Sequence, residues 1–223
     1  MAFQAGGQRP APRPVPESPE AQAYLRDYAT LLEAVPFPSV VLDHRWDVVL
    51  CNAAFETLFH AVGPHPTAMP GDNFLRFVLF HPDAGTVLGE HESSWCLPML
   101  AQFAAALERH AQDRGLQSIR RDIAQDPIME AAYRQGLPHW IRAVGEEAVQ
   151  QDGAVRPLLH PDPHWGATAC RIVCETPGVL ENAGYTRLTL VPRETRRPAD
   201  VPRRTRRPRR SASHLSVVPA PEA

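Results

Sequence analysis

The order of two hydrophobic periodicities constrains the fold of this chain more than any other feature. Apolar residues alternate with other residues, as in strands, within 40–51 and again within 155–159, 168–174 and 187–191. The intervening residues 52–149 mostly repeat apolar positions every three or four residues, which is typical of amphipathic helices. This order predicts an α+β fold, an antiparallel sheet of about five strands with the mostly helical middle segment packed across one face.

The first strand pair is expected to form a hairpin that leads directly into a helix. Residues 40–42 and, after a polar break, residues 46–51 alternate in polarity, and so short a connection favours antiparallel pairing. Asn52 follows at once, and its side chain is a strong N-cap. The apolar face of the helix it starts comprises Phe55, Leu58 and Phe59.

Further helices are expected through the middle of the chain, in segments 74–81, 95–107, 116–124, 127–136 and 140–149. Gly115 is expected to end the second of these helices, and Asp126 followed by Pro127 is a well-matched start for the fourth. Residues 177–184, rich in turn formers, predict a long hairpin loop between the last two strands.

Changes in composition divide the chain into three parts. Residues 1–23 are rich in proline and are expected to form a disordered tail. Residues 193–223 contain nine arginines and three acidic residues, a net charge of +6, and predict a disordered Arg/Pro-rich basic tail. The central residues 24–192 contain 12 arginines and 20 acidic residues, so the expected folded domain carries a net charge of −8.

Cysteine usage and hydropathy indicate the expected compartment. The four cysteines are dispersed apart from Cys170 and Cys174, and residues 1–23 contain no apolar segment of the kind that directs secretion. No apolar run reaches the roughly 18 residues that a membrane helix needs. We therefore expect a reduced, cytoplasmic protein.

Four segments, taken in order, carry a resemblance to a known family. Residues 40–55, which contain Asp43, Trp46-Asp47-Val48 and Asn52-Ala53-Ala54, look like the opening of a PAS-type domain. More closely, they resemble the ligand-binding domain of the MmyB-like transcription regulators common in actinobacteria, whose opening has an Asp-x-x-Trp-Asp-Val hairpin followed by Asn-x-Ala. Three later segments are similar to further elements of that family, namely residues 73–84, 126–136 and 158–166.

The chain departs from the family in one respect. Its members normally carry a DNA-binding helix-turn-helix ahead of this domain, whereas about 30 Pro-rich residues precede it here. We therefore expect a stand-alone sensor and interaction module that acts on transcription through a protein partner, as a homodimer or as a heterodimer with a DNA-binding regulator. The charge of the central domain opposes phosphate binding, and direct contact with DNA stays open.

The resemblance implies a pocket between sheet and helices for a small apolar or amphipathic molecule, with fatty-acid-like ligands among the known occupants. Such pockets are lined mainly by apolar and aromatic side chains. Arg76 or Arg171 would meet a carboxylate. The predicted ligand-binding residues are Trp46, Phe55, Phe59, Phe74, Phe77, Arg76, Trp95, Phe103, Trp140 and Leu188. For each apolar residue the alternative is a role in the core alone.

Other chemistries find little support in the sequence. His160, His164, Cys170 and Cys174 are zinc-ligand types, but the two cysteines would lie about 13 Å apart along a strand, and no metal is expected. No nucleotide-binding or catalytic signature occurs, so we predict no enzyme, although a small enzyme of unrecognised type stays an alternative. No cofactor is expected. Haem and flavin, which some PAS-like domains bind, stay open without a signature here.

The basic tail offers a different class of function, which is nonspecific binding of nucleic acid or of an acidic partner. The arginines concerned are Arg203, Arg204, Arg206, Arg207, Arg209 and Arg210. This alternative predicts salt-dependent, sequence-indifferent binding that is lost when residues 193–223 are deleted. The tail is equally compatible with contact to the acidic domain or with simple solvation.

Overall fold

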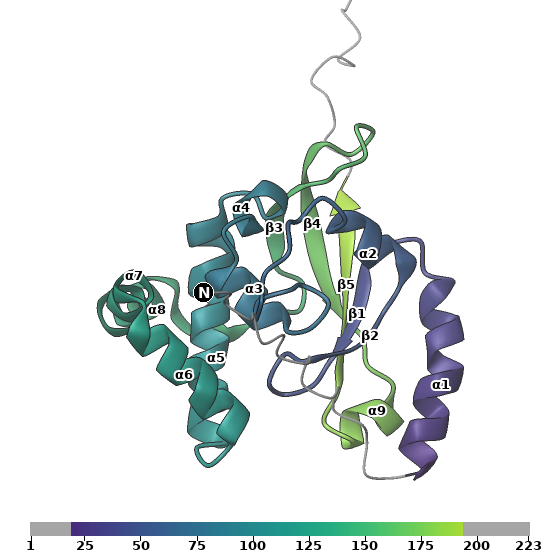
Figure 1. Ribbon diagram of the computed structural model, residues 1–223, viewed down its shortest axis with the longest axis horizontal. Helices are drawn as coiled ribbons and strands as arrows, with labels where there is room; N and C mark the ends of the chain where they lie inside the picture. Colours follow the sequence, from purple (N-terminus) through teal and green to yellow (C-terminus); the bar gives the residue numbers. More distant parts are fainter. Residues whose placement is uncertain (1–18, 194–223) are drawn as a thin grey trace, which may run out of the picture.

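A five-stranded antiparallel sheet forms the centre of the protein. The computed structural model describes residues 19–193. Its strands lie in the order β2-β1-β5-β4-β3 (Figure 1). They comprise β1 (Ser39–Leu42), β2 (Val48–Cys51), β3 (Val155–Leu159), β4 (Ala167–Cys174) and β5 (Thr186–Arg193). The expected α+β, PAS-like architecture with two strands before the helical segment and three after it is confirmed.

The hairpin between β1 and β2 forms as expected, but its second strand begins later than the alternation indicated. Val41 pairs with Leu50, and Leu42 pairs with Val48 across an irregularity in register. Trp46, expected as the first residue of the strand, has a φ of 63° and lies in the turn. The Asp43 carboxylate holds this turn by accepting hydrogen bonds from the backbone N–H groups of Arg45 and Asp47, at 2.8 and 2.9 Å.

The middle segment is helical, with caps where short polar side chains precede apolar runs. The helices are α2 (Ala53–Leu58), α3 (Phe74–Phe80), α4 (Ala84–Val87), α5 (Leu97–Arg109), α6 (Arg114–Gln125), α7 (Pro127–Ala131) and α8 (Leu137–Val144). Asn52, Asn73, Asp113 and Asp126 cap α2, α3, α6 and α7 with their side-chain oxygens. The predicted caps at Asn52 and Asp126 are thus confirmed.

Several predicted helix boundaries were wrong. The helix expected to end at Gly115 ends at Arg109, and Gly115 lies in the first turn of α6 because Asp113 caps that helix. Trp95 lies in a π-helical turn, η1 (His91–Cys96), directly before α5. A second π-helical turn, η2 (Ala132–Gly136), follows α7, and the 3-10 turn η3 (Gly145–Val149) follows α8.

Two helices on the opposite face of the sheet were not predicted. Helix α1 (Pro19–Glu33) includes residues 19–23, which the proline content had assigned to the tail, and α9 (Gly178–Asn182) lies in the expected hairpin loop. Both cover the face turned away from α3–α8 (Figure 1). Their buried contacts join Leu25, Tyr28, Leu32 and Leu180 to Val41, Val49 and Tyr185. The sheet therefore carries helices on both faces, of which the sequence had predicted only those of the middle segment.

The larger hydrophobic core lies between the sheet and α2–α8. Alternate strand residues face it, including Leu42, Leu158, Cys170, Ile172 and Leu188. These positions confirm the period of two that the sequence showed in the strands. The predicted tail residues 1–18 and 194–223, with the six arginines between Arg203 and Arg210, lie outside the described residues.

Candidate ligand site

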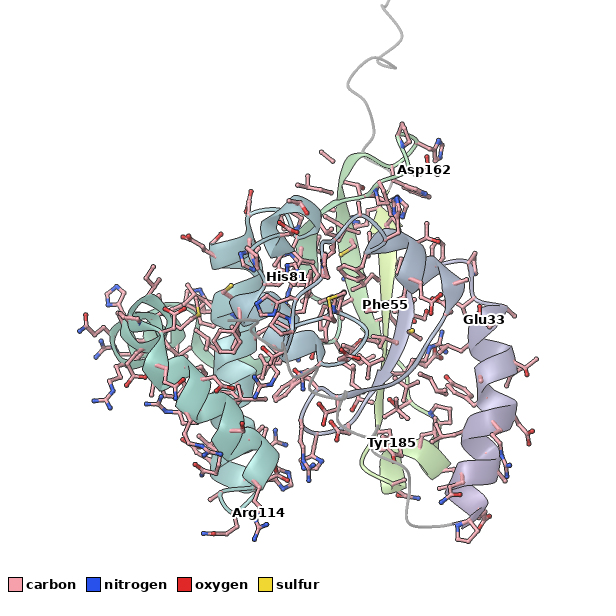
Figure 2. All side chains as sticks on the ribbon, viewed as in Figure 1. Glu33, Phe55, His81, Arg114, Asp162 and Tyr185 are labelled. Carbon is pink, nitrogen blue, oxygen red and sulfur yellow. The ribbon has the colours of Figure 1, made fainter. Side chains whose placement is uncertain are left out.

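Four of the predicted ligand-binding aromatic residues pack against one another. The rings of Phe55 and Phe59 are 4.8 Å apart, those of Phe59 and Phe77 are 5.1 Å apart, and Phe74 lies within 6.3 Å of all three. None is more than 5 % exposed. Figure 2 shows Phe55 between α2 and the sheet. These rings fill the core at α2 and α3, and none of them lines either of the two cavities described below.

The other predicted aromatic residues lie nearer to α5. Trp95 is fully buried, and its indole Nε1 donates a hydrogen bond of 2.9 Å to the Pro157 carbonyl of β3. Phe103, also fully buried, meets Tyr133 edge-on at 6.2 Å. Trp140 of α8 is half-buried against the same core. Trp95 thus connects the helical layer to the sheet, and none of the three residues lines either of the two cavities described below.

Neither arginine suggested for a ligand carboxylate is free to act in the interior. Arg76 pairs with Asp122 at 2.6 Å and also donates to the Ser118 hydroxyl at 3.3 Å. Arg171 is exposed and donates to the Gly153 carbonyl at 2.7 Å. Because these groups already have partners, the structure gives no support to either arginine as the carboxylate contact.

A cavity of about 280 Å³ lies between α5 and the end of the sheet formed by β1 and β5. Of the residues predicted from the sequence, Trp46 and Leu188 line it. Small and polar side chains from other elements form much of the remaining wall. That remainder consists of Leu42, Asp43, His44, Gln102, Ala105, Ala106, Arg109, His110, Val149, Gln151, Gly184 and Thr186. The site therefore draws on the turn after β1, on α5, on η3 and on β5.

His44, which lines this cavity, belongs to a small charged network. Asp113 accepts hydrogen bonds from the side chains of His44 and Arg45, at 3.1 and 2.9 Å, and from the backbone N–H of Leu116 at 3.0 Å. Burial alone would raise the pKa of Asp113, but these donors lower it to about 2. The rings of His44 and His110 lie 5.0 Å apart. The network fastens the turn after β1 to the start of α6.

Asp43 is a buried carboxyl in the cavity wall. It is 9 % exposed. Burial and then the nearby charge of Asp47 raise its pKa, and the two backbone N–H groups that it binds oppose this shift. The wall therefore includes a carboxyl that holds its proton more readily than an exposed aspartic acid does.

Two buried polar side chains near α5 lack hydrogen-bond partners among the described residues. Gln102, which lines the cavity, is 8 % exposed, and its amide Nε2 has no acceptor. Arg156 of β3 is 4 % exposed, and its Nη1 has no acceptor. Neither residue was predicted from the sequence as part of a site. A signal existed for Arg156, because its spacing of two from Leu158 places it on the core-facing side of the strand.

The zinc-ligand residue types do not converge. Among residues 19–193, no group of three His, Cys, Asp or Glu side chains is placed to hold a metal ion. Cys170 and Cys174 are free thiols, and burial raises the pKa of each to about 11. Both are therefore protonated at neutral pH, which makes them poor nucleophiles.

A second cavity, of about 380 Å³, lies at the opposite end of the sheet. It is lined by Pro36, Phe37, Pro38, Ala54, Thr57, His160, Asp162, Trp165 and Pro192. Asp162 marks the tip of the β3–β4 hairpin in Figure 2. None of the predicted ligand-binding residues belongs to this cavity.

Within residues 19–193 no helix is long and apolar enough to cross a bilayer.

Comparison with family models gives a match over residues 25–137 to the family described as "MmyB-like transcription regulator ligand binding domain". The matched region runs from α1 to the start of α8 and includes β1, β2 and α5. No curated protein matches the chain.

Proposed function

The chain belongs to the family of MmyB-like transcription regulator ligand-binding domains, and from this premise we propose that it binds a small apolar or fatty-acid-like ligand and signals to a protein partner. The observation that carries the proposal is the cavity between α5 and the sheet. Its volume of about 280 Å³ is slightly below the roughly 300–1000 Å³ typical of small-molecule sites. Trp46, Leu42 and Leu188 supply apolar wall to this cavity.

The position of the cavity supports a sensing role. Its walls come from β1 and β5 on one side and from α5 and η3 on the other, so a ligand touches both layers of the domain. A ligand shifts a conformational or dimerisation equilibrium by no more than its difference in affinity for the two states. Signalling therefore requires that α5 and the sheet hold the ligand better in one arrangement than in another.

The remaining expectations from the sequence stay predictions. As a member of a family of regulator domains, the protein is proposed to act by binding rather than catalysis. A homodimer or a heterodimer with a DNA-binding regulator, and a cytoplasmic location, are untested. The alternative of nucleic-acid or acidic-partner binding depends on Arg203–Arg210, which lie outside the described residues.

Thermal unfolding with and without dodecanoate tests the proposal. At a free concentration about 100 times its Kd, a ligand that binds only the folded state adds about 2.7 kcal/mol of stability. For a domain of this size that corresponds to an increase in Tm of about 5–10 °C. Ala105→Trp places an indole at the cavity wall and is expected to weaken dodecanoate binding at least tenfold by filling the site.

Ala111→Trp is the matched control, because Ala111 is exposed just beyond the end of α5 and does not line the cavity. It should bind dodecanoate as the unmodified protein does. Equal binding by the Ala105→Trp variant would place the ligand elsewhere. The absence of any change in Tm with dodecanoate, with shorter and longer carboxylates and with the matching alcohols would contradict the proposed function.

A further inference from the structure

The second cavity, of about 380 Å³, has walls of aromatic rings and prolines that come from distant parts of the chain. Residues 36–38 (Pro-Phe-Pro) lie between α1 and β1, Trp165 lies in the β3–β4 hairpin, and Pro192 lies near the end of β5. Phe37 and Trp165 are half-buried and Pro36 is exposed, so the cavity is open to solvent. Open sites with aromatic walls suit extended, proline-rich segments.

Hydrogen bonds hold both sides of the second cavity in place. On one side, the Phe37 carbonyl accepts a hydrogen bond of 3.0 Å from the amide Nδ2 of Asn52. On the other side, the Asp162 carboxylate accepts a bond of 2.8 Å from the His164 N–H, and the Nδ1 of His160 accepts one of 3.0 Å from the Asp162 N–H. Walls that are already ordered lower the entropy cost of binding.

The charge at the second cavity is negative. Asp162 lines the cavity, is exposed and forms no ion pair among residues 19–193. Glu56 is exposed on α2 between the lining residues Ala54 and Thr57. Burial lowers the pKa of His160, so this lining residue is neutral at pH 7. The lining residues include no arginine, and the chain contains no lysine, so a basic ligand is favoured.

The chain itself contains a segment of matching chemistry, which begins close to the second cavity. The Thr168 hydroxyl donates a hydrogen bond of 2.8 Å to the Arg193 carbonyl, and β5 ends there, at the same end of the sheet as the β3–β4 hairpin (Figure 1). Thirty residues follow Arg193, and residues 196–210 among them contain eight arginines, three prolines and one aspartate. Residue 196 is four positions beyond Pro192, a distance that an extended chain spans in about 14 Å.

We propose that the second cavity binds residues 196–210 of its own chain. A proline of this segment packs against Phe37 and Trp165, and its arginines meet Asp162 and Glu56. A short connection keeps the segment at an effective concentration on the order of 1 mM, so individually weak contacts are sufficient. The contact does not involve the cavity beside α5, so the inference goes beyond the proposed function. While the segment is bound, its arginines are withheld from other acidic partners.

Competition with a labelled peptide that has the sequence of residues 196–210 tests the proposal. Fluorescence anisotropy compares peptide binding to the unmodified full chain with binding to a full-chain variant that carries Pro198→Gly, Pro202→Gly and Pro208→Gly. This variant keeps every charge and loses the prolines that fill the cavity. It should bind the peptide about tenfold more tightly, because the unmodified protein's own segment competes at an effective concentration of about 1 mM.

Substitutions at the second cavity, made in the variant without the three prolines, locate the bound peptide. Trp165→Ala should weaken binding about tenfold, whereas His164→Ala, at an exposed neighbour that does not line the cavity, should leave it unchanged. Asp162→Asn keeps an oxygen for the His164 N–H and removes the charge, so binding should weaken about two- to fivefold. Glu181→Gln is the control for charge, because Glu181 is exposed on α9 at the other end of the sheet.

The outcomes that would overturn the proposal differ in what they show. Equal binding of the peptide by the two full chains, or binding by neither, would mean that the segment does not occupy the cavity. Equal losses in Asp162→Asn and Glu181→Gln would reduce the contact to a general attraction between a basic segment and an acidic domain. A difference between the two chains that vanishes on dilution would assign the cavity to the segment of a second copy. Dodecanoate binding is measured separately, so none of these outcomes affects the proposed function.

Discussion

Asn52 shows how much one side chain contributes to this fold. Its Oδ1 accepts hydrogen bonds from the backbone N–H of Ser39 and of Phe55, both at 3.0 Å. Its amide Nδ2 lies 2.9 Å from the Val35 carbonyl and 3.0 Å from the Phe37 carbonyl. The sequence predicted the cap on α2, but the contacts with the segment between α1 and β1 are tertiary and have no local signal.

Asn52→Ala is therefore expected to cost about 2–4 kcal/mol of unfolding free energy. The lost cap accounts for about 1 kcal/mol, and buried backbone groups left without a partner account for about 1–3 kcal/mol. Urea denaturation measures the difference. Asp126→Ala, which removes the cap of α7 at a more exposed position, should cost only about 1 kcal/mol. Equal losses in the two variants would show that the additional contacts of Asn52 contribute nothing.

Removing the charge of Arg156 is expected to raise the free energy of unfolding, whereas Asn52→Ala is expected to lower it. Among residues 19–193 the buried guanidinium of Arg156 has no ion-pair partner, so Arg156→Met should raise the unfolding free energy by about 1–3 kcal/mol. Arg171→Met, on the exposed side of the neighbouring strand, should change it by less than about 1 kcal/mol. Guanidinium denaturation after organic extraction compares the two variants. A loss of stability in Arg156→Met would mean that the guanidinium has a stabilising partner in the ligand-free state.

At the scale of elements, Asp113 joins the turn after β1 to α6. Its depressed pKa of about 2 means that the carboxylate stabilises the folded protein at pH values above the unfolded-state pKa, about 3.9. This contribution is lost as the pH falls toward 2. Asp113→Asn keeps a residue able to cap α6 but removes the charge that meets His44 and Arg45.

The unfolding free energies of the unmodified protein and of Asp113→Asn should therefore differ at pH 7 and converge between about pH 5 and pH 2. Urea denaturation at a series of pH values measures this difference. A difference that stays constant down to pH 2 would contradict the assigned role of the charge, because protonation removes it from the unmodified protein as well.

The helices and strands that a capping residue or an alternating pattern marks were predicted from the sequence. Those that depend on contacts between distant segments were not. The caps at Asn52 and Asp126 and the alternation in β4 placed α2, α7 and the sheet correctly. Helix α1 was missed because prolines surround its start, although Ala21, Leu25, Tyr28 and Leu32 follow a helical spacing. Trp46 lies outside β2, contrary to the prediction, because the Asp43 carboxylate binds two backbone N–H groups and holds a turn there.

At the scale of the whole molecule, the candidate cavity was harder to predict than the fold. Large aromatic residues were expected to line the pocket, but Phe55, Phe59, Phe74 and Phe77 pack on each other because close ring packing fills the core. The cavity lies where side chains are small, beside Ala105, Ala106 and Gly184. Ala105, Ala106 and Gln102 belong to α5 and Gly184 to the segment before β5, and no spacing in the sequence indicates that these two segments lie together.

The two layers meet at this site, and this arrangement connects the fold with the proposed function. Helix α5 follows the turn η1, which contains Trp95, and reaches the cavity with its second half, while β5 lies at the centre of the sheet. Under the proposed function, a ligand bound between them would stabilise one arrangement of the two layers. Helices α1 and α9 cover the other face of the sheet.

Native mass spectrometry of the purified protein, before and after organic extraction, tests the central claim that this domain holds a small ligand. The account predicts a species heavier than the 24.7 kDa chain, whose extra mass is lost on extraction and restored by added dodecanoate. The released compound should ionise as a carboxylate. A spectrum that shows the chain mass alone, both as purified and after dodecanoate is added, would contradict the account.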